Sequence, residues 1–490
     1  MEREKVLIIN TGGTIGMVYD DPDNPLSPLR PGTWEEMTKN VPLLNNLPFD
    51  IHLYTFDPLL DSSCMKPKHW IQIAQIIEKN YDKYSGFVIL HGTDTMCYTA
   101  SALSFKLIHL GKPVIITGAQ LSMVMPRSDA LQNLITSLYI AAPKTMKLPI
   151  VPEVCIFFRD HLLRGNRSRK LSASGYEAFK SPNYPPLGVS GEHIKIDTKL
   201  LRPLPKPDQG ELFYVDTMDI ETNVMVLDIF PGINPEILRN IIKNSDSKSK
   251  IKALILKTYG TGNVPTGKEN EDFLDVIKEI TNSGILVVNI TQCIEGMVEL
   301  GLYETSSDLL DIGVISGLDM TPEAALTKLM VLLKKGWTLE EVARQMQINQ
   351  CGEQSINIYN IDYESGSTNP IYKGTKMIPG EINFSRLERA TLRFQEVELL
   401  EKNNTNNEVI LKVYTNYPQL NFNTPENIPQ FAGIIKRTLK TNQTKFNLFL
   451  DVTSNVKRFL NPGKYCTLSI LSSEKQIQWK KLNLAIYTWV

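Results

Sequence analysis

The sequence predicts two α/β domains with mostly parallel sheets, followed by a β-rich C-terminal extension. Over the first 200 residues, short apolar runs alternate with helix-length amphipathic segments, a pattern typical of a parallel sheet covered on both faces. After a Pro-rich stretch from Leu201 to Gly210, the alternation resumes in a smaller unit. From about Asn403, Asn, Thr and Lys become frequent and short strands alternate with turn-rich segments. This last change indicates a third, mostly β region.

The first domain is expected over residues 1–200. Each of its strands is a short apolar run, and its first helix has apolar side chains at the spacing of one helix face. The expected strands are Val6–Ile9, His52–Phe56, Phe87–Leu90, Val114–Thr117 and Val154–Phe158, and the expected helices are His69–Tyr81, Met96–His109 and Ser128–Ala141.

The second domain is expected over residues 222–362, after a linker at residues 201–221. Thr321 and Pro322 form a typical helix start, a hydroxyl N-cap followed by proline. The expected strands are Met225–Ile229, Ala253–Lys257 and Ile285–Ile290, and the expected helices are Pro235–Lys243, Asn270–Asn282 and Pro322–Lys334.

The C-terminal extension is expected over residues 363–490. We expect one charged amphipathic helix at its start, Arg386–Lys402, because its apolar residues recur at helical spacing. The expected strands are Val409–Tyr414, Asn447–Val452, Cys466–Leu471 and Leu484–Thr488.

Composition narrows the classes of function. The 490 residues, 42% of them hydrophobic, suffice for two or three cores. A formal net charge of −1, without a long basic run, predicts no nucleic-acid or membrane-surface partner. No apolar stretch approaches the ~18 residues that span a bilayer, and the charged amino-terminal segment has no signal-peptide core. We expect the partner to be a small molecule or another copy of the chain.

The cysteines and histidines predict neither disulfides nor a metal site. The six cysteines are scattered without CxxC spacing, and the six histidines show no ligand spacing. Such a distribution is typical of reduced thiols in a cytoplasmic protein.

Two apolar strands run out into loops of glycine and threonine, Thr11 to Thr14 (TGGT) and His91 to Thr95 (HGTDT). Ligands of open α/β sheets bind at the carboxyl ends of parallel strands. Gly12 and Gly13 permit close approach of a ligand to the backbone, and Thr14 is the candidate nucleophile, which needs a base to take its proton. The alternative is a phosphate loop or a plain tight turn, although GGTIG matches neither the Walker A pattern nor GxGxxG.

Further polar residues follow other strands. Thr93 and Asp94 place a hydroxyl beside a carboxylate, which can orient a lysine or accept a substrate ammonium; capping of the next helix is the alternative. Asp61, Ser62 and Ser63 offer a third polar loop, for which an Asx or Ser/Thr turn is the alternative.

Lys170 ends the basic run from Arg164 to Lys170. A desolvated lysine can act as a base on a neighbouring hydroxyl, whereas the alternative is an exposed basic loop in which nothing local distinguishes Lys170 from Arg167 or Arg169. We expect His91 to be a structural hydrogen-bonding residue, and Cys97 and Cys293 to be packing thiols.

Taken together, these motifs resemble the type I (cytosolic-type) L-asparaginase family. The resemblance covers roughly residues 5–360 and leaves the remainder of the chain unmatched. It rests on Thr11 to Gly16, Asp61 to Ser63, His91 to Thr95, Arg164 to Asn166 with Lys170, Tyr259 to Asn263, Asn289 to Cys293, and Gly317 to Thr321.

The resemblance implies hydrolysis of the side-chain amide of L-asparagine to aspartate and ammonia, without a cofactor. It makes Thr14 the nucleophile that forms an acyl-enzyme, with oxyanion stabilisation from backbone N–H groups near Gly13 and Thr93. A second set moves protons: Thr93, Lys170 and Asp94. The substrate's α-ammonium contacts Asp94, and its α-carboxylate end is held by Asp61, Ser62 and Ser63. Members form dimers or dimers of dimers, so the resemblance implies a homo-oligomer.

One departure concerns the tyrosine that assists the nucleophile. Many members place it about ten residues after the threonine, where this chain has a leucine. Tyr303 has the spacing of a tyrosine used in this way in animal-like members, with a packing aromatic as the alternative; Tyr19 lies too early by spacing. Some members also bind asparagine at an allosteric site, and Arg169 stands where these have a small hydroxyl residue. The matching allosteric positions are Lys257, Thr258, Tyr259, Gly260, Thr261, Gly262, Asn263, Thr291 and Cys293.

Competing functions remain at this stage. Mixed asparaginase/glutaminase specificity is open, because one methylene changes binding by only ~1–3 kcal/mol. The amide-donor subunit of a tRNA amidotransferase usually has a domain before its TGGT loop, whereas this chain reaches Thr14 at once. A lysophospholipase label sometimes accompanies this family, but the chain has no GxSxG elbow to support that activity. A non-catalytic asparagine-binding sensor would signal through the C-terminal region.

Overall fold

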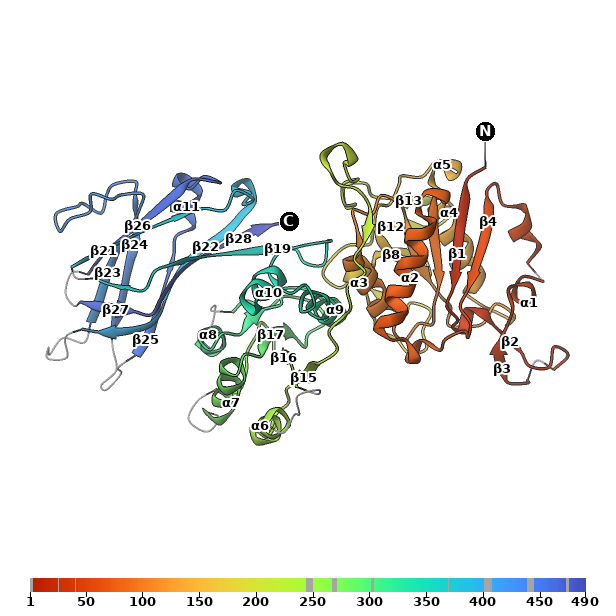
Figure 1. Cartoon of the computed structure of the whole chain (residues 1–490), viewed down its shortest axis with the longest axis horizontal. Coiled ribbons are helices and arrows are strands. Elements are labelled where there is room, and N and C mark those ends of the chain that lie inside the picture. Colours follow the sequence, from red (N-terminus) through yellow and green to blue (C-terminus); the bar gives the residue numbers. More distant parts are fainter. Residues whose placement is uncertain are drawn as a thin grey trace. The chain divides into compact units, whose positions relative to one another are not determined.

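Figure 1 shows a computed structural model of the chain. The structure describes residues 3–24, 26–39, 41–243, 250–266, 271–300, 304–368, 370–400, 408–438, 445–472 and 476–490. The chain divides into two compact units, residues 1–346 with 350–354, and residues 347–349 with 355–490. The first unit contains both α/β domains, and the second contains the β-rich region.

The first α/β domain is built on a sheet with the strand order β13-β12-β9-β8-β7-β5-β1-β4 (Figure 1). The strands from β4 to β8 in this order are parallel, and β9, β12 and β13 add antiparallel pairings at the other end. The strands are β1 (Lys5–Asn10), β4 (Asp50–Thr55), β5 (Gly86–Leu90), β7 (Val114–Thr117), β8 (Val154–Phe158), β9 (His161–Arg164), β12 (Gly188–Ser190) and β13 (Ile194–Ile196). The expected strands agree with these within two residues at each end.

Helices cover both faces of this sheet. Leu7 and Ile9 of β1 pack toward α2 and α3, whereas Val6 and Ile8 pack toward α4, as the alternation of side chains along a strand requires. The helices are α1 (Trp34–Thr38), α2 (Pro67–Asn80), α3 (Met96–Lys106), α4 (Ala130–Ala141) and α5 (Pro143–Met146).

The connectivity of the sheet reverses between β1 and β5. From β1 the chain goes to β4 on one side, and then crosses to β5 on the other side of β1. Such a switch point opens a crevice outside the carboxyl ends of the two strands. The two Gly-Thr loops follow these two strands, so the topology places both at the crevice.

The second α/β domain has a fully parallel sheet in the order β15-β16-β17-β18. One face packs on α6, α7 and α8, and the other on α9 and α10. Its strands are β15 (Val224–Asp228), β16 (Ala253–Thr258), β17 (Leu286–Thr291) and β18 (Ile315–Ser316), and its helices are α6 (Pro235–Lys243), α7 (Glu271–Asn282), α8 (Glu304–Asp311), α9 (Pro322–Leu332) and α10 (Leu339–Met346).

Short strand pairs modify two expectations in the first unit. The helix expected over Met96–His109 ends at Lys106, because β6 (Leu107–Ile108) pairs with β14 (Tyr214–Val215). The expected linker at residues 201–221 therefore carries a strand that is tied to the first domain. Two further pairs are β2 (Met17–Tyr19) with β3 (Leu29–Pro31), and β10 (Arg169–Lys170) with β11 (Phe179–Lys180).

The C-terminal unit consists of two antiparallel sheets that share one core. One has the order β19-β28-β22-β27-β20 with β25 paired to β22, and the other has the order β21-β26-β23-β24. Since β19 pairs along its whole length with β28, residues 356–363 belong to this unit, although residue 362 was the expected boundary. The strands are β19 (Ile356–Tyr363), β20 (Gly366–Ser367), β21 (Ile371–Met377), β22 (Leu387–Leu399), β23 (Glu408–Thr415), β24 (Phe431–Thr438), β25 (Lys445–Asp451), β26 (Tyr465–Ser472), β27 (Ile477–Trp479) and β28 (Lys481–Trp489), with one helix, α11 (Thr453–Phe459).

The prediction of a helix over Arg386–Lys402 is wrong, because Leu387–Leu399 forms the strand β22; residues 401 and 402 lie outside the described residues. Ala390, Leu392 and Phe394 alternate into the core, and a bulge then shifts the register so that Val397 is also buried. The bulge residue Glu396 has a φ of 50°. Because the bulge inserts an extra residue, positions 390, 394 and 397 acquire the i, i+4, i+7 spacing of a helix face, which explains the misreading.

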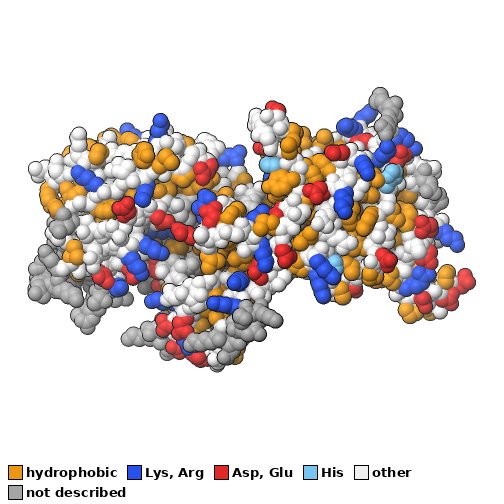
Figure 2. Space-filling model, viewed as in Figure 1, with side chains coloured by type: hydrophobic (Ala, Val, Ile, Leu, Met, Phe, Trp, Pro, Cys, Tyr) orange, Lys and Arg blue, Asp and Glu red, His pale blue; other side chains and the backbone are white. Residues whose placement is uncertain are grey.

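The surface carries both signs of charge. On the face drawn in Figure 2, Lys and Arg side chains are interspersed with Asp and Glu, in keeping with the net charge of −1. Among the described helices, none is both long enough and apolar enough to cross a membrane.

Candidate active site

The TGGT loop is held against its neighbours by backbone contacts that only glycine allows. Gly12 and Gly13 have φ values of 117° and 94°. A Cβ on Gly12 would lie 2.3 Å from the Leu60 carbonyl oxygen, and one on Gly13 would lie 2.4 Å from the Gly92 nitrogen. The loop that contains Thr14 therefore touches both the segment before Asp61 and the HGTDT loop. Thr14 itself begins a short 3₁₀ turn, Thr14–Gly16.

The Asp61 loop completes the group of three strand-end loops. A Cβ on Gly92 would lie 2.6 Å from Ser62 Oγ, and the Thr95 hydroxyl donates to the Ser62 carbonyl at 2.7 Å. Asp61 caps a 3₁₀ turn by accepting from the Ser63 N–H at 2.8 Å. The Ser63 side chain and N–H hydrogen bonds lower the pKa of Asp61 below its usual range, so its carboxylate stays ionised at neutral pH.

Lys170 reaches the HGTDT loop from a distant part of the sequence. Its Nζ donates to Thr93 Oγ1 at 2.8 Å and lies 2.7 Å from Asp94 Oδ1. The Lys170 side chain is 18% exposed, whereas that of Asp94 is 65% exposed. The structure thus brings together a hydroxyl, an amine and a carboxylate, and it distinguishes Lys170 from the arginines beside it. The carboxylate of Asp94 keeps an open side toward solvent.

His91 is structural, as expected. It is fully buried, its Nδ1 lies 2.6 Å from the Gly92 carbonyl oxygen, and its Nε2 lies 2.8 Å from Thr99 Oγ1. Burial lowers the pKa of His91 to about 4, so the ring is neutral at physiological pH. Trp70 Nε1 donates to the same Thr99 hydroxyl. His91 therefore fixes the start of the HGTDT loop.

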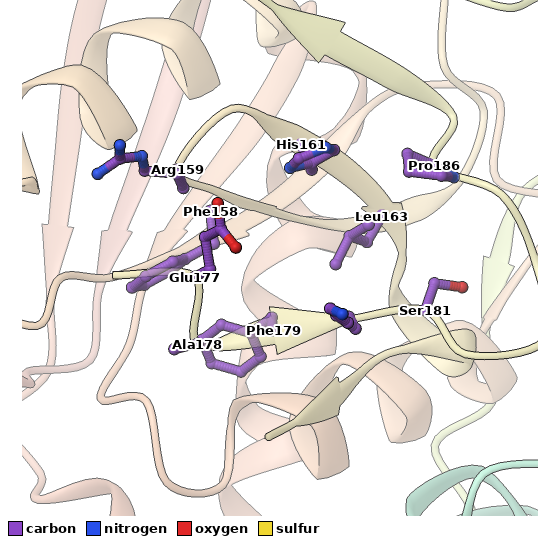
Figure 3. Close-up of a pocket in the computed structure, with 10 residues that line it drawn as sticks. Phe158, Arg159, His161, Leu163, Glu177, Ala178, Phe179, Ser181 and Pro186 are labelled. Carbon is purple, nitrogen blue, oxygen red and sulfur yellow. The ribbon is translucent and has the colours of Figure 1, made fainter. Parts of the chain in front are cut away.

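A pocket borders the β10–β11 pair but contains none of the expected site residues. It has a volume of about 240 Å³ and lies between the β8–β9 hairpin and the segment around β11 (Figure 3). Phe158, Leu163 and Phe179 form its apolar part. Because the candidate residues lie at the strand ends of β1 and β5, the site is defined by their contacts and not by this cavity. Among the described residues, no group of three His, Cys, Asp or Glu side chains could hold a metal ion.

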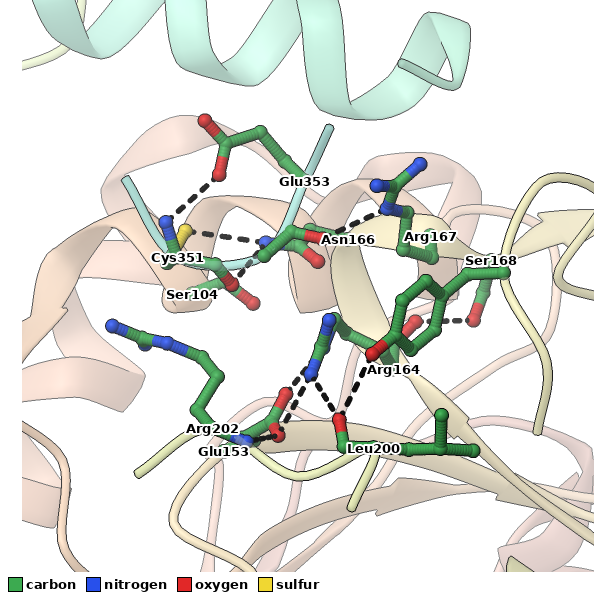
Figure 4. A network of polar contacts seen from close by, with 12 residues as sticks. Ser104, Glu153, Arg164, Asn166, Arg167, Ser168, Leu200, Arg202, Cys351 and Glu353 are labelled. Carbon is green, nitrogen blue, oxygen red and sulfur yellow. Dashed lines mark hydrogen bonds and ion pairs between the residues drawn. The ribbon is translucent and has the colours of Figure 1, made fainter. Parts of the chain in front are cut away.

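The basic run before Lys170 is buried, so the alternative of an exposed loop is wrong. Figure 4 shows Arg164 beside Glu153; the guanidinium donates to this carboxylate at 2.5 and 3.0 Å. Asn166 Nδ2 donates to the carbonyl oxygen of Cys351 at 3.0 Å (Figure 4). Arg167 donates to Asp319 Oδ2 at 2.7 Å and to the Gly352 carbonyl at 2.8 Å. These contacts bind the segment before Lys170 to the second α/β domain and to residues 350–354.

Sequence reasoning missed the partners of this run. Asp319 belongs to a motif that was used only for the resemblance, and Glu323, which directly follows the helix start at Thr321 and Pro322, was given no role. Arg169 Nε lies 3.6 Å from Glu323 Oε2 on α9. Two carboxylates separated by three residues at the start of α9 were the available signal, since buried arginines require such partners.

The expected allosteric positions gather at the carboxyl edge of the second sheet. Lys257 Nζ lies 2.6 Å from Asp228 Oδ1, and the Thr258 hydroxyl donates to Asn289 Oδ1 at 2.7 Å. Tyr259 and Asn263 form an isolated bridge, and Thr291 Oγ1 accepts from the Cys293 N–H at 3.0 Å. Gly260, Thr261 and Gly262 form the turn within that bridge. Lys257, Thr258 and Thr291 therefore have local partners, whereas the buried Tyr259 hydroxyl has no hydrogen-bond partner among the described residues.

Of the two candidate tyrosines, the structure describes one. Tyr303 lies outside the described residues. Tyr19 ends β2 and pairs with Leu29 of β3, which places it on the hairpin that directly follows the Thr14 turn.

The fold and this group of side chains define a class: a two-domain α/β protein that places threonine-bearing loops at the switch point of its first sheet. Two models of known protein families match this chain. The family model described as "Asparaginase, N-terminal" matches residues 5–202, and that described as "Glutaminase/Asparaginase C-terminal domain" matches residues 223–346. The chain belongs to the asparaginase family.

Individual relatives match the same part of the chain. L-asparaginase 1 of Escherichia coli (strain K12) is 44% identical over 357 residues, which cover 72% of this chain and 98% of that protein. The crystal structure of L-asparaginase I from Vibrio cholerae matches with a TM-score of 0.63 and 42% identity, covering 72% and 99% of the two chains. The L-asparaginase of Thermococcus kodakarensis matches with a TM-score of 0.60 and 33% identity, again covering 72% and 99%.

Proposed function

We propose that the protein is an L-asparagine amidohydrolase, which converts L-asparagine to L-aspartate and ammonia. The observation that carries this proposal is the contact of Lys170 Nζ with both Thr93 Oγ1 and Asp94 Oδ1, beside the loop of Thr14. Membership of the asparaginase family supports the same reaction, as do the names of the relatives from E. coli and V. cholerae.

Thr14 is the proposed nucleophile. Its hydroxyl oxygen gives up its proton and bonds to the side-chain amide carbon, the carbon–nitrogen bond breaks, and the nitrogen leaves as ammonia with one proton added, so no net proton is gained or lost. The remaining β-aspartyl ester on Thr14 is then cleaved by water, which restores the hydroxyl and releases aspartate. Both steps place negative charge on the amide oxygen, so N–H donors are needed. The close approach of the Gly13 and Gly92 backbones supports donors at Gly13 and Thr93.

Thr93, Lys170 and Asp94 are the proposed proton-moving set. Because Lys170 Nζ donates to Thr93 Oγ1, the hydroxyl proton of Thr93 is left to point elsewhere, toward the substrate. In this arrangement Thr93 can pass a proton to the leaving ammonia or take one from the attacking water, with Lys170 as the next carrier. Asp94 holds the Lys170 amine in place and offsets its charge. A tyrosine, Tyr303 or Tyr19, is the proposed assistant of Thr14.

The substrate's α-groups have proposed partners of opposite charge or suitable polarity. The open carboxylate of Asp94 suits the α-ammonium, and the loop of Asp61, Ser62 and Ser63 suits the α-carboxylate end through its hydroxyl and N–H groups. This loop touches Gly92, which supports a single binding site shared by the three loops.

Ammonia release from L-asparagine by the wild type and by Thr14→Ala tests the proposal. We expect the wild type to release ammonia and aspartate in equal amounts and Thr14→Ala to release almost none. Equal rates in both proteins would contradict the nucleophile assignment, and absence of release by the wild type would contradict the function. L-glutamine assayed in parallel measures specificity, for which one methylene is worth about 10- to 200-fold in kcat/KM.

We also propose that the protein is a cytoplasmic homo-oligomer. Six cysteines without disulfides support the cytoplasmic location. Ile237 and Ile241, one turn apart on α6, are 61% and 45% exposed, and Val226 on the edge strand β15 is 42% exposed. Exposed apolar side chains of this kind are typical of subunit interfaces. Light scattering should give a dimer or tetramer, and Ile237→Lys with Ile241→Lys should reduce its mass; a monomeric wild type would contradict the proposal.

The residues grouped at the second sheet edge, from Lys257 to Asn263 with Thr291 and Cys293, are the proposed effector site. Their clustering in the second domain supports this assignment. Asparagine binding there would make the dependence of rate on asparagine sigmoidal, whereas a hyperbolic dependence in the oligomer would contradict it.

A further inference from the structure

The strand β10 consists of two residues whose side chains point to opposite faces. Lys170 points to Thr93 and Asp94, whereas Arg169 points to Glu323 on α9 of the second α/β domain. Opposite directions are what consecutive residues of a strand require. The backbone that carries Lys170 is therefore held on its other side by an ion pair that crosses between the two α/β domains.

The Arg169–Glu323 ion pair is largely shielded from solvent. The two side chains are 21% and 12% exposed, and Nε and Oε2 lie 3.6 Å apart. Both atoms are buried, and neither has a hydrogen-bond partner among the described residues. Arg169 is the largest source of compensation for the Glu323 carboxylate, ahead of the Glu323 N–H, the Thr321 hydroxyl and Lys257.

Other polar and titratable groups also interact with Glu323. Cys97 and Tyr98 lie on α3, Lys257 lies on β16, and Thr321 precedes α9. Burial raises the pKa of Glu323, and the positive charges of Arg169 and Lys257 oppose that rise. Stability alone does not call for such a pair, because well-packed apolar residues replace buried ion pairs with little loss or some gain.

Glu323 sits on a firmly held element. It lies in the first turn of α9, which Thr321 caps by accepting from the Ala324 N–H at 3.1 Å. The Thr327 hydroxyl donates to the Glu323 carbonyl at 2.8 Å.

Among the described strands, β10 pairs with the equally short β11 alone, and the pairing continues where the Leu171 N–H donates to the Ala178 carbonyl at 2.7 Å. Arg164, Asn166 and Arg167 hold the segment before the strand. The ion pair of Arg169 is the restraint directly beside Lys170, where a displacement of about 1 Å can cost roughly 100-fold in rate.

We propose that Arg169 is a positioning residue, whose ion pair with Glu323 anchors β10 to the second α/β domain and so places the Lys170 amine between Thr93 and Asp94. The inference rests on the proposed function, because it assigns a task to Arg169 only if Lys170 moves protons. The ion pair thereby links the position of the second α/β domain to that of the proposed proton-moving residues in the first domain. Loss of either charge shifts Lys170 while the loops that bind the substrate stay in place.

Kinetics of five variants in the full chain test this role. Arg169→Met removes the charge at similar length, Arg169→Lys keeps it, Glu323→Gln removes the partner with little change of shape, and the double variant combines Arg169→Met with Glu323→Gln. Arg159→Met is the matched control, since Arg159 also lies near a carboxylate, Asp160, at 3.4 Å but is exposed. All are assayed for ammonia release from L-asparagine below their unfolding transitions.

We expect Arg169→Met and Glu323→Gln each to lower kcat roughly 10- to 100-fold with little change in KM. Arg169→Lys should recover most of the loss, and the double variant should be no worse than either single variant, because the two residues act as one unit. Arg159→Met should match the wild type. If Arg169→Met does not fold, the near-isosteric Glu323→Gln carries the test with the same expectation.

Wild-type kcat in Arg169→Met or Glu323→Gln would overturn the inference, as would losses that multiply in the double variant. A rise in KM with unchanged kcat would overturn it too. These results differ from failure of the proposed function, in which the wild type itself releases no ammonia.

Discussion

The two α/β domains each have a parallel sheet with threonines at its carboxyl edge. In the first sheet the relevant edge lies at the ends of β1 and β5, and in the second sheet it lies at the ends of β16 and β17. At the first edge, glycines allow the loops to approach one another closely; Thr14 is half-buried and the Asp94 carboxylate is exposed. At the second edge, Thr258 is buried and bonded to Asn289, and Lys257 is paired with Asp228. The polar side chains named here at the second edge therefore hydrogen-bond or form ion pairs with one another.

The difference shows that topology provides only the place for a site. The switch point between β1 and β5 gathers three loops, whereas the second sheet runs in simple order from β15 to β18. The proposed reaction also needs a hydroxyl that is held on one side and accessible on the other, and half-buried Thr93, held by Lys170, meets that requirement. Substitutions of equivalent residues at the two edges can therefore break or sharpen the comparison.

The lysines should give the largest difference. Lys170→Met removes the partner of Thr93 and Asp94, so kcat should fall by roughly 1,000-fold or more, the scale expected for a member of a catalytic unit. Lys257→Met removes a pair in which the Asp228 side chain is 57% exposed, so kcat should stay within a few-fold of the wild type. Ammonia release measures both. Similar losses in the two variants would abolish the distinction between the edges.

The glycines should give the next difference. Gly13→Ala forces a Cβ to within 2.4 Å of the Gly92 nitrogen at a φ of 94°, so we expect loss of activity together with a clear drop in thermal midpoint. Gly260→Ala, at a φ of 49°, meets its nearest atom at 3.7 Å and should cost only about 1 kcal/mol of unfolding free energy. Thermal unfolding and ammonia release check both, and a fully active Gly13→Ala would contradict the described contact.

Thr258→Val probes the second edge alone. The buried hydroxyl of Thr258 donates to Asn289 Oδ1, and both side chains are inaccessible to solvent. Its removal leaves the Asn289 oxygen without that donor, which costs about 1–3 kcal/mol of unfolding free energy. Denaturant titration should show this loss with kcat nearly unchanged. A large fall in kcat without loss of stability would instead place the second edge in the reaction.

The smallest expected effect is a shift in pH dependence at Asp61. Hydrogen bonds from the Ser63 side chain and N–H lower the pKa of Asp61 from its ordinary 3.8, so these bonds are kept above that pH and lost as pH falls through the lowered pKa. Ser63→Ala removes the largest cause, and Asp61 should protonate at a higher pH. KM for L-asparagine, measured on the acid side, should begin to rise at a higher pH than in the wild type. Superimposable profiles would contradict the contact.

Most of the first unit could be predicted because its signals are local. The strands Val114–Thr117 and Val154–Phe158 are short apolar runs with defined ends, and the structure has them at the same residues. Thr14, Thr93 and Asp94 were found because they follow such strands. The strand β22 could not be predicted in this way, since its bulge creates a helical spacing from residue 390 to residue 397.

The features of the site that the sequence did not predict depend on contacts between residues far apart in the chain. Nothing around Arg164 or Arg167 in the sequence shows that Glu153 and Asp319 bury them, so the run looked like an exposed loop. Lys170 was separable from Arg169 only once their partners were known, because the two residues point to different domains.

Acid quenching of the wild type during turnover of L-asparagine, followed by peptide mapping, tests the central claim most directly. If the first edge is the catalytic one and Thr14 is its nucleophile, a β-aspartyl ester should appear on the peptide that contains Thr14, and Thr14→Ala should show none. An ester on the peptide that contains Thr93, or turnover by Thr14→Ala at the wild-type rate, would contradict the account.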